Sequence, residues 1–226
     1  MLEILTGPLL KLALIVFTVG LLVRVALYIK GLDWRLERVA YAYGGSLGVK
    51  GAIWSIFKWL VPFGTHSWRK QLFTTIAFFL FHAGVVICPL FLAGHMILLE
   101  ETVGFSLPSL PTAAGDVLAA LGFLGGIMLM LRRITLPQVR ILSDKQDWAI
   151  LTLCLITLGS GIIARYQFGA YDFWLTLHML AGEIILFIAP FTKLSHIALF
   201  FASRAQLGMD FAIKRGGATR GPAFPW

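Results

Sequence analysis

The sequence predicts an all-α membrane protein with five transmembrane helices. Of its 226 residues, 58% are hydrophobic and only 13% are charged, whereas soluble domains carry about a quarter of charged residues. The apolar residues form five stretches, each long enough to cross a hydrocarbon layer of about 30 Å as a helix. These stretches cover about residues 5–29, 71–99, 113–131, 147–166 and 172–201. We therefore expect residues 1–226 to form a single membrane domain that packs in the lipid bilayer and against its own helices.

The basic residues predict how the chain crosses the membrane. Fifteen lysines and arginines lie in the connection 30–70, in the connection after the third span and in the tail 204–226, but Arg165 is the one basic residue in the connections on the other side. Cytoplasmic loops are enriched in lysine and arginine. We expect an outer N-terminus and an inner C-terminus in a bacterial cytoplasmic membrane. The net charge of +8 then reflects topology and does not indicate nucleic-acid binding.

Three local patterns complete the outline of the chain. The start, MLEILTG, has Glu3 and no early basic residue, so we expect the first span to be retained and not cleaved as a signal peptide. Within the cytoplasmic loop 30–70, the stretch 51–64 has Trp54, Phe57 and Trp59 among lysines. This is typical of a helix in the inner membrane interface. The Gly- and Pro-rich stretch 215–226 predicts no helix; it is either disordered or lies across a partner on the inner face.

Two of the spans carry a histidine near each end, and ionisable residues inside a span indicate function. His178 and His196 are 18 residues apart, so we expect them on one face of a single helix, about 27 Å apart along its axis. His82 and His95 occupy the second span, which runs in the opposite direction. By depth, His82 therefore matches His196 near the inner surface, and His95 matches His178 near the outer surface.

Two matched pairs of histidines are the ligand set that two bis-histidine b-type haems require. Zinc sites need three or four ligands in one small shell and fit less well. Cys88 and Cys154 lie in apolar runs without a CxxC motif, which excludes a c-type haem attachment and indicates packing residues. Two other classes stay open, a haem-free anchor or scaffold with hydrogen-bonded histidines and a transporter with histidine proton relays.

The histidines of the second span are not ideally placed on one straight helix. His82 and His95 are 13 residues apart, which puts them about 140° apart around an ideal helix. Pro89 lies between them, and we expect it to kink or rewind the span so that both rings are usable. His66 precedes Arg69 and Lys70 and is expected at the surface.

Three stretches carry a resemblance to a known family. They are FHAGVVICPLFLAGH (81–95), LHMLAGEIILFIAPFTKLSH (177–196) and LRRITLPQVRILSDKQDW (131–148). Together they resemble the cytochrome b (gamma) subunit of respiratory nitrate reductase and its relatives, such as the membrane subunits of the high-molecular-weight cytochrome c complex of sulfate-reducing bacteria. The resemblance covers the chain from residue 71 onward. It implies a four-helix haem-binding bundle plus one further helix, with His82 and His196 on the inner haem b and His95 and His178 on the outer haem b.

The resemblance also implies a function in anaerobic respiration. Members of this superfamily are electron-transfer subunits of multi-subunit oxidoreductases, and menaquinone or menaquinol is the quinone expected here. The partners that the resemblance implies are an iron–sulfur or other redox subunit on the cytoplasmic face, a periplasmic multihaem cytochrome c and other membrane subunits. Electrons would pass across the membrane between the quinone or periplasmic partner and the cytoplasmic partner.

The chain departs from the nitrate reductase subunit at two points. The interval between His82 and His95 is longer, which indicates an extra turn around Pro89. The lysine that the family uses at its quinol site is missing, because EETVGFSLPSLPTAAGD (100–116) has neither Lys nor Arg. The remaining candidates for quinone contact are Gly94, His95, Asp116 and Glu183.

Several other residues keep two interpretations each. Arg165 either neutralises a propionate of the outer haem or extends into the headgroup region. Glu183 either handles protons near the outer haem or forms hydrogen bonds within the bundle. Gly84 and Gly182 either make room for porphyrin or serve helix packing. Arg132 and Arg133 either bind propionates of the inner haem or fix the topology.

Overall fold

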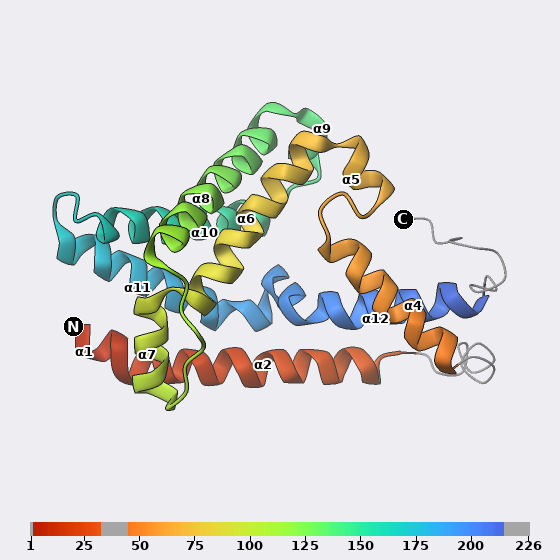
Figure 1. Ribbon diagram of the computed structural model, residues 1–226, viewed down its shortest axis with the longest axis horizontal. Helices are drawn as coiled ribbons and strands as arrows, with labels where there is room; N and C mark the ends of the chain where they lie inside the picture. The colour runs from red at the N-terminus through yellow and green to blue at the C-terminus, as the bar shows by residue number, and fades with distance from the viewer. Residues whose placement is uncertain (1, 33–44, 215–226) are drawn as a thin grey trace. The chain divides into compact units, whose positions relative to one another are not determined.

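The computed structural model of the chain describes residues 2–32 and 45–214, which form helices and turns with no strand among them (Figure 1). Five helical stretches are long and apolar enough to cross a membrane. They are Leu2–Lys30, Leu72–Phe91, Thr112–Thr135, Lys145–Arg165 and Tyr171–Phe191. The predicted all-α class with five membrane-crossing helices is therefore confirmed, and the chain is a multi-pass membrane protein. The predicted non-helical stretch 215–226 lies outside the described residues.

The first of two compact units comprises residues 1–19 and 76–194. Its elements are α1 (Leu2–Ile4), a π-helical turn η1 (Leu5–Leu9), the first half of α2 (Leu10–Lys30), most of α6 (Leu72–Phe91), α7 (Ala93–Val103), α8 (Thr112–Thr135), α9 (Pro137–Ile141), α10 (Lys145–Arg165), α11 (Tyr171–Ile188) and the 3-10 turn η2 (Ala189–Phe191). Helix α10 packs against both α8 and α11. The buried side chains of Phe81, Leu151, Cys154 and Leu158 form the core of this unit, so Cys154 is the packing residue that the sequence predicts.

Helices α6 and α8 touch through glycines. A Cβ atom added to Gly84 would lie 2.6 Å from the Cα of Gly122, and the converse distance is also 2.6 Å. A methyl group at either position would push the two backbones apart, as at the small-residue contacts of membrane helices. Of the two roles predicted for Gly84, helix packing is the one that these contacts support.

The second unit comprises residues 20–75 and 195–226. Among its described residues are the second half of α2, α4 (Gly45–Leu60), α5 (His66–Lys70), the start of α6 and α12 (His196–Lys214). Helices α4 and α12 lie side by side (Figure 1), with Gly51 against Gly208. Nε and Nη2 of Arg204 donate hydrogen bonds of 3.1 and 2.9 Å to the buried Ser55 hydroxyl. The predicted helix in the loop is present as α4, although it begins before residue 51 and ends at Leu60.

The second predicted span is two helices, not one kinked helix. Helix α6 ends at Phe91, Leu92 is extended (φ −72°, ψ 135°), and α7 begins at Ala93. Pro89 has no N–H group to continue the helical hydrogen bonds. The backbone N–H of Leu110 donates a 2.8 Å hydrogen bond to the Phe91 carbonyl, which satisfies a group that the break exposes. The distortion predicted near Pro89 is therefore a break at Leu92, and His95 belongs to a helix of its own.

The fifth predicted span is also interrupted. Helix α11 ends at Ile188, the 3-10 turn η2 contains Pro190, and Thr192 is extended (φ −122°, ψ −176°). A second 3-10 turn, η3 (Lys193–Ser195), leads into α12, whose first residue is His196 and which continues past residue 201 to Lys214. The prediction that His178 and His196 share a face of one helix is wrong, because the chain changes conformation between them.

Lys193, in this interruption, is bound to the start of α10. Its Nζ lies 2.8 Å from a carboxylate oxygen of Asp144 and 2.8 Å from one of Asp147, and its backbone N–H donates to Oε1 of Gln146 at 3.2 Å. Asp144 and Asp147 also form the capping box of α10. The hydrogen bond from Lys193 holds the pKa of Asp144 below its usual value, and the hydrogen bonds to Asp144 and Asp147 raise the pKa of Lys193.

Replacing Lys193 with Met should lower the Tm, by less than about 4 °C because the ion pairs are exposed. The carboxylate of Asp144 stabilises the fold above its unfolded pKa of 3.8, and this contribution is lost as the pH falls through its lower folded pKa. The Tm difference between the variant and the native chain should therefore be present at pH 7 and vanish in acid. Lys145→Met, at an exposed neighbour, is the control. Equal Tm values at pH 7, or a difference that persists below the pKa of Asp144, would contradict the assignment.

Candidate functional site

Two of the four predicted ligands meet in the first unit. His95 on α7 and His178 on α11 approach each other with their Nε2 atoms 3.4 Å apart. The rings are within 17° of parallel and their centroids are 5.8 Å apart. Both side chains are half-buried. The structure thus brings together the pair that was predicted for the outer surface. The helices that carry the two histidines, α7 and α11, have other boundaries than the predicted spans.

The other ring nitrogen of each histidine is bound to a backbone carbonyl. Nδ1 of His178 donates to the Thr157 carbonyl of α10 at 2.8 Å, and Nδ1 of His95 donates to the Cys88 carbonyl of α6 at 3.0 Å. Because a carbonyl oxygen only accepts, each Nδ1 must carry the hydrogen. In a neutral imidazole the Nε2 atom is then the acceptor. Two nitrogen lone pairs therefore face each other across a gap of 3.4 Å.

Two facing lone pairs repel unless an electropositive centre lies between them. A metal-bound histidine commonly donates its second N–H to a backbone carbonyl, which is the arrangement of both rings here. Metal–imidazole bonds are about 2 Å long, so two opposed ligands lie about 4 Å apart, and a small outward movement of the rings suffices. The alternative is a proton shared by the two rings. Among residues 2–32 and 45–214, no group of three or more His, Cys, Asp or Glu side chains could hold a metal ion.

The surroundings of the two rings differ in the space they leave. A Cβ atom on Gly161 would lie 2.8 Å from Nδ1 and Cε1 of the His178 ring, so the ring occupies the place of a side chain on α10. A Cβ atom on Gly94 or Gly182 would meet nothing within 4 Å. Gly94 adjoins His95, and Gly182 lies one helical turn after His178. Neither glycine therefore makes a close packing contact, and the role of Gly182 beside a porphyrin stays a prediction.

Sequence reasoning missed three parts of this site. Thr157 and Gly161 lie four residues apart on one face of α10, where the first accepts a hydrogen bond from His178 and the second makes room for its ring. This four-residue spacing is the signal in the sequence that could have identified Thr157 and Gly161 as neighbours of a histidine ring. The Cys88 carbonyl accepts from the Leu92 N–H at 3.0 Å as well as from His95. The break at Leu92 allows the His95 ring to reach back to that carbonyl.

The charged residues that the sequence singles out are arranged as follows. Arg165 donates from Nε and Nη2 to the two carboxylate oxygens of Asp116, at 3.1 and 3.4 Å, so the propionate candidate and one quinone candidate are bound to each other. Glu183 is buried, with 5% of its surface exposed. Its Oε2 atom has no hydrogen-bond partner among the described residues. Of the basic pair at the end of α8, Arg133 lies 3.7 Å from a carboxylate oxygen of Asp147.

The pair predicted for the inner surface, His82 and His196, is not established by the structure. His82 lies on α6, where its Nδ1 donates to the Phe78 carbonyl at 2.8 Å and its ring packs against the Phe78 ring at 3.9 Å between centroids. His196 is the first residue of α12. The two histidines belong to different units, and their pairing stays a prediction. His66 is exposed at the start of α5, as the sequence predicts.

Comparison with known proteins yields one strong relation. No protein-family model and no solved structure matches the chain. A curated protein of Nitratidesulfovibrio vulgaris (strain Hildenborough), described simply as "Protein", is 60% identical over 222 residues, which are 98% of each chain. The chain belongs to the same family as this Nitratidesulfovibrio vulgaris protein.

Proposed function

We propose that this chain is a cytochrome b subunit of a respiratory oxidoreductase complex, with His95 and His178 as the axial ligands of a haem b. The observation that carries the proposal is the pair of opposed Nε2 atoms, each on a ring whose Nδ1 hydrogen is bound to a backbone carbonyl. Haem bound there would supply one-electron transfer at its iron. The bilayer excludes charge from this region, so a pair of neutral imidazoles suits a ligand role better than a charged side chain.

The residues around the pair have distinct tasks in this proposal. The carbonyls of Thr157 and Cys88 fix the tautomer and orientation of the two rings and increase the basicity of Nε2. Gly161 admits the His178 ring, and Gly182 would leave room for a porphyrin beside it. The ion pair of Arg165 with Asp116 holds a guanidinium on α10 and a carboxylate on α8. Exchange of Asp116 for a haem propionate would preserve the charge balance of Arg165.

The proposal also includes a second haem b, held by His82 and His196. This second pair rests on the sequence prediction alone. Electrons would then cross a bacterial cytoplasmic membrane between menaquinone or a periplasmic multihaem cytochrome c and a cytoplasmic iron–sulfur subunit. A partner subunit would supply or receive these electrons. For the quinone, the buried and unpartnered Oε2 of Glu183 supports a proton-handling role beside the haem of His95 and His178.

Haem content per chain tests the proposal. We expect two haems b per chain in the intact purified complex, measured by reduced-minus-oxidised spectra and haem extraction. A content near one would contradict the second pair. A content near zero would favour the alternative, a haem-free anchor subunit in which His95 and His178 share a proton, since 3.4 Å between the nitrogens is also within hydrogen-bond reach.

A further inference from the structure

A small cavity lies in the second unit. It has a volume of about 170 Å³ and is lined by Trp59, Thr65, Ser67, Trp68, Gln71 and Thr74. These residues come from the end of α4, from α5 and its two flanking residues Thr65 and Gln71, and from the start of α6. A cavity of about 150 Å³ holds a benzene molecule, so this space, which is partly open, takes one ring of a fused aromatic ligand and leaves the second ring in the opening.

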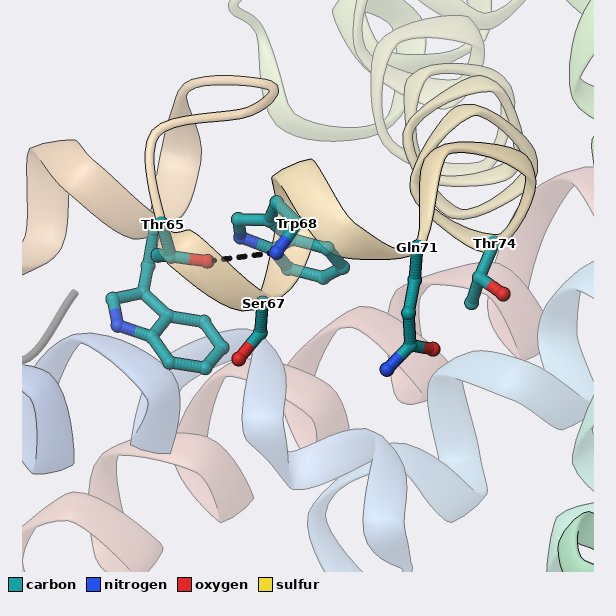
Figure 2. Close-up of a pocket in the computed structure, with 6 residues that line it drawn as sticks. Thr65, Ser67, Trp68, Gln71 and Thr74 are labelled. Atoms are coloured by element: carbon teal, nitrogen blue, oxygen red, sulfur yellow. Dashed lines mark hydrogen bonds between the residues drawn. The ribbon is translucent and has the colours of Figure 1, made fainter.

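The walls of the cavity are held in place by the chain itself. The Trp68 backbone N–H donates to Thr65 Oγ1 at 3.2 Å (Figure 2), and the Trp68 carbonyl accepts from Thr75 Oγ1 at 2.8 Å. The rings of Trp59 and Trp68 meet edge to face with centroids 5.7 Å apart. The Arg204 guanidinium lies 4.6 Å from the centroid of the Trp59 ring. The two indoles are therefore fixed before any ligand enters, which reduces the entropy lost on binding.

The chemistry of the lining selects a neutral ligand that accepts hydrogen bonds. All six lining residues are uncharged, which disfavours a phosphate or another anion. Figure 2 shows the side chains of Ser67, Gln71 and Thr74 extending to the same side of the chain. Nε1 of Trp59 is buried and has no acceptor among the described residues. A buried N–H group without an acceptor is costly, and a carbonyl oxygen of a ligand would satisfy it.

We propose that this cavity binds the head group of a quinone, separately from the site at His95 and His178. An aromatic ring would pack against the two indoles, and a ring carbonyl would accept the hydrogen bond of Trp59 Nε1. The exposed apolar residues on α4, Ile53, Trp54, Phe57 and Leu60, give the isoprenoid tail a lipid-facing surface next to the cavity. No electron transfer is assigned to this site, and its occupancy does not depend on haem.

Photolabelling of the full-length chain in detergent tests this proposal. With 3-azido-2-methyl-1,4-naphthoquinone as the probe, we expect saturable labelling within residues 59–74 that excess menadione prevents. Trp59→Phe keeps the ring but removes the N–H, and should raise the menadione concentration for half-competition about fivefold, the loss of one neutral hydrogen bond. Trp148→Phe makes the same change on α10 of the first unit, where the residue does not line the cavity, and should leave this concentration unchanged. Gln71→Leu is a second test variant. It removes a polar side chain from the lining of the cavity and keeps both indoles.

Several results would overturn the proposal. Labelling outside residues 59–74, or labelling that menadione does not prevent, would exclude a quinone at this cavity. Competition by phosphatidylglycerol but not by menadione would identify a lipid headgroup site. Equal half-competition in Trp59→Phe, Gln71→Leu and the native chain would show that neither side chain contacts the quinone, which would contradict the proposed site. Haem content is measured on the same samples, so a chain without haem that still shows the expected labelling would contradict only the proposed function.

Discussion

Replacing His178 with Ala should remove one haem b and leave the other, lowering the content from two haems to one per chain. Its Nε2 atom faces that of His95 at 3.4 Å, and a haem that loses one of two axial ligands is no longer held from both sides. His95→Ala should remove the same spectral component, because the two residues form one site. The measurement is the reduced-minus-oxidised spectrum of the purified complex, together with the low-spin signals in electron paramagnetic resonance.

Two controls separate ligand loss from misfolding. His66→Ala changes an exposed histidine on α5 and should keep both haems. Added imidazole should restore the lost component in His178→Ala, because the small ligand can occupy the vacated position. His196→Ala should remove the other component if the second pair is formed as the sequence predicts. Loss of different components in His95→Ala and His178→Ala would show that these residues do not share a haem.

Replacing Gly161 with Ala should weaken haem binding at this site while His178 itself is kept. The added methyl group would lie 2.8 Å from two atoms of the His178 ring, so the ring must turn and its hydrogen bond to the Thr157 carbonyl is lost. Loss of a group that orients a metal ligand commonly reduces affinity tenfold to a hundredfold. We expect at least a tenfold faster transfer of this haem to apomyoglobin, followed by absorbance.

The matched control is Gly7→Ala in the π-helical turn near the N-terminus, where a Cβ atom meets nothing within 4 Å. That variant should keep the native rate of haem transfer. The ratio of low-spin to high-spin haem reports independently whether His178 still binds the iron. A general loss of stability would not change this ratio at one haem alone. An unchanged ratio and an unchanged transfer rate in Gly161→Ala would contradict the orienting role of α10.

The sequence alone determined the number of membrane-crossing helices, because the free energy of transferring a helix into lipid depends chiefly on which side chains it carries. It also identified His95 and His178 as partners. That inference required only that the second and fifth spans run in opposite directions, so that residues near the same surface lie at similar depth. Neither step depends on the detailed path of the backbone, and both survive the interruptions in the two spans.

The tertiary structure alone decided where those spans end and how the rings are held. Pro89 and Pro190 each remove a helical hydrogen bond, but the sequence does not reveal whether the helix then bends or breaks. The outcome depends on distant partners for the exposed backbone groups, such as the Leu110 N–H that reaches the Phe91 carbonyl. The role of Gly161 likewise follows from the approach of α11 to α10. Contacts between residues far apart in the chain arise only when the helices pack, because only packing brings a side chain of one helix against the backbone of another.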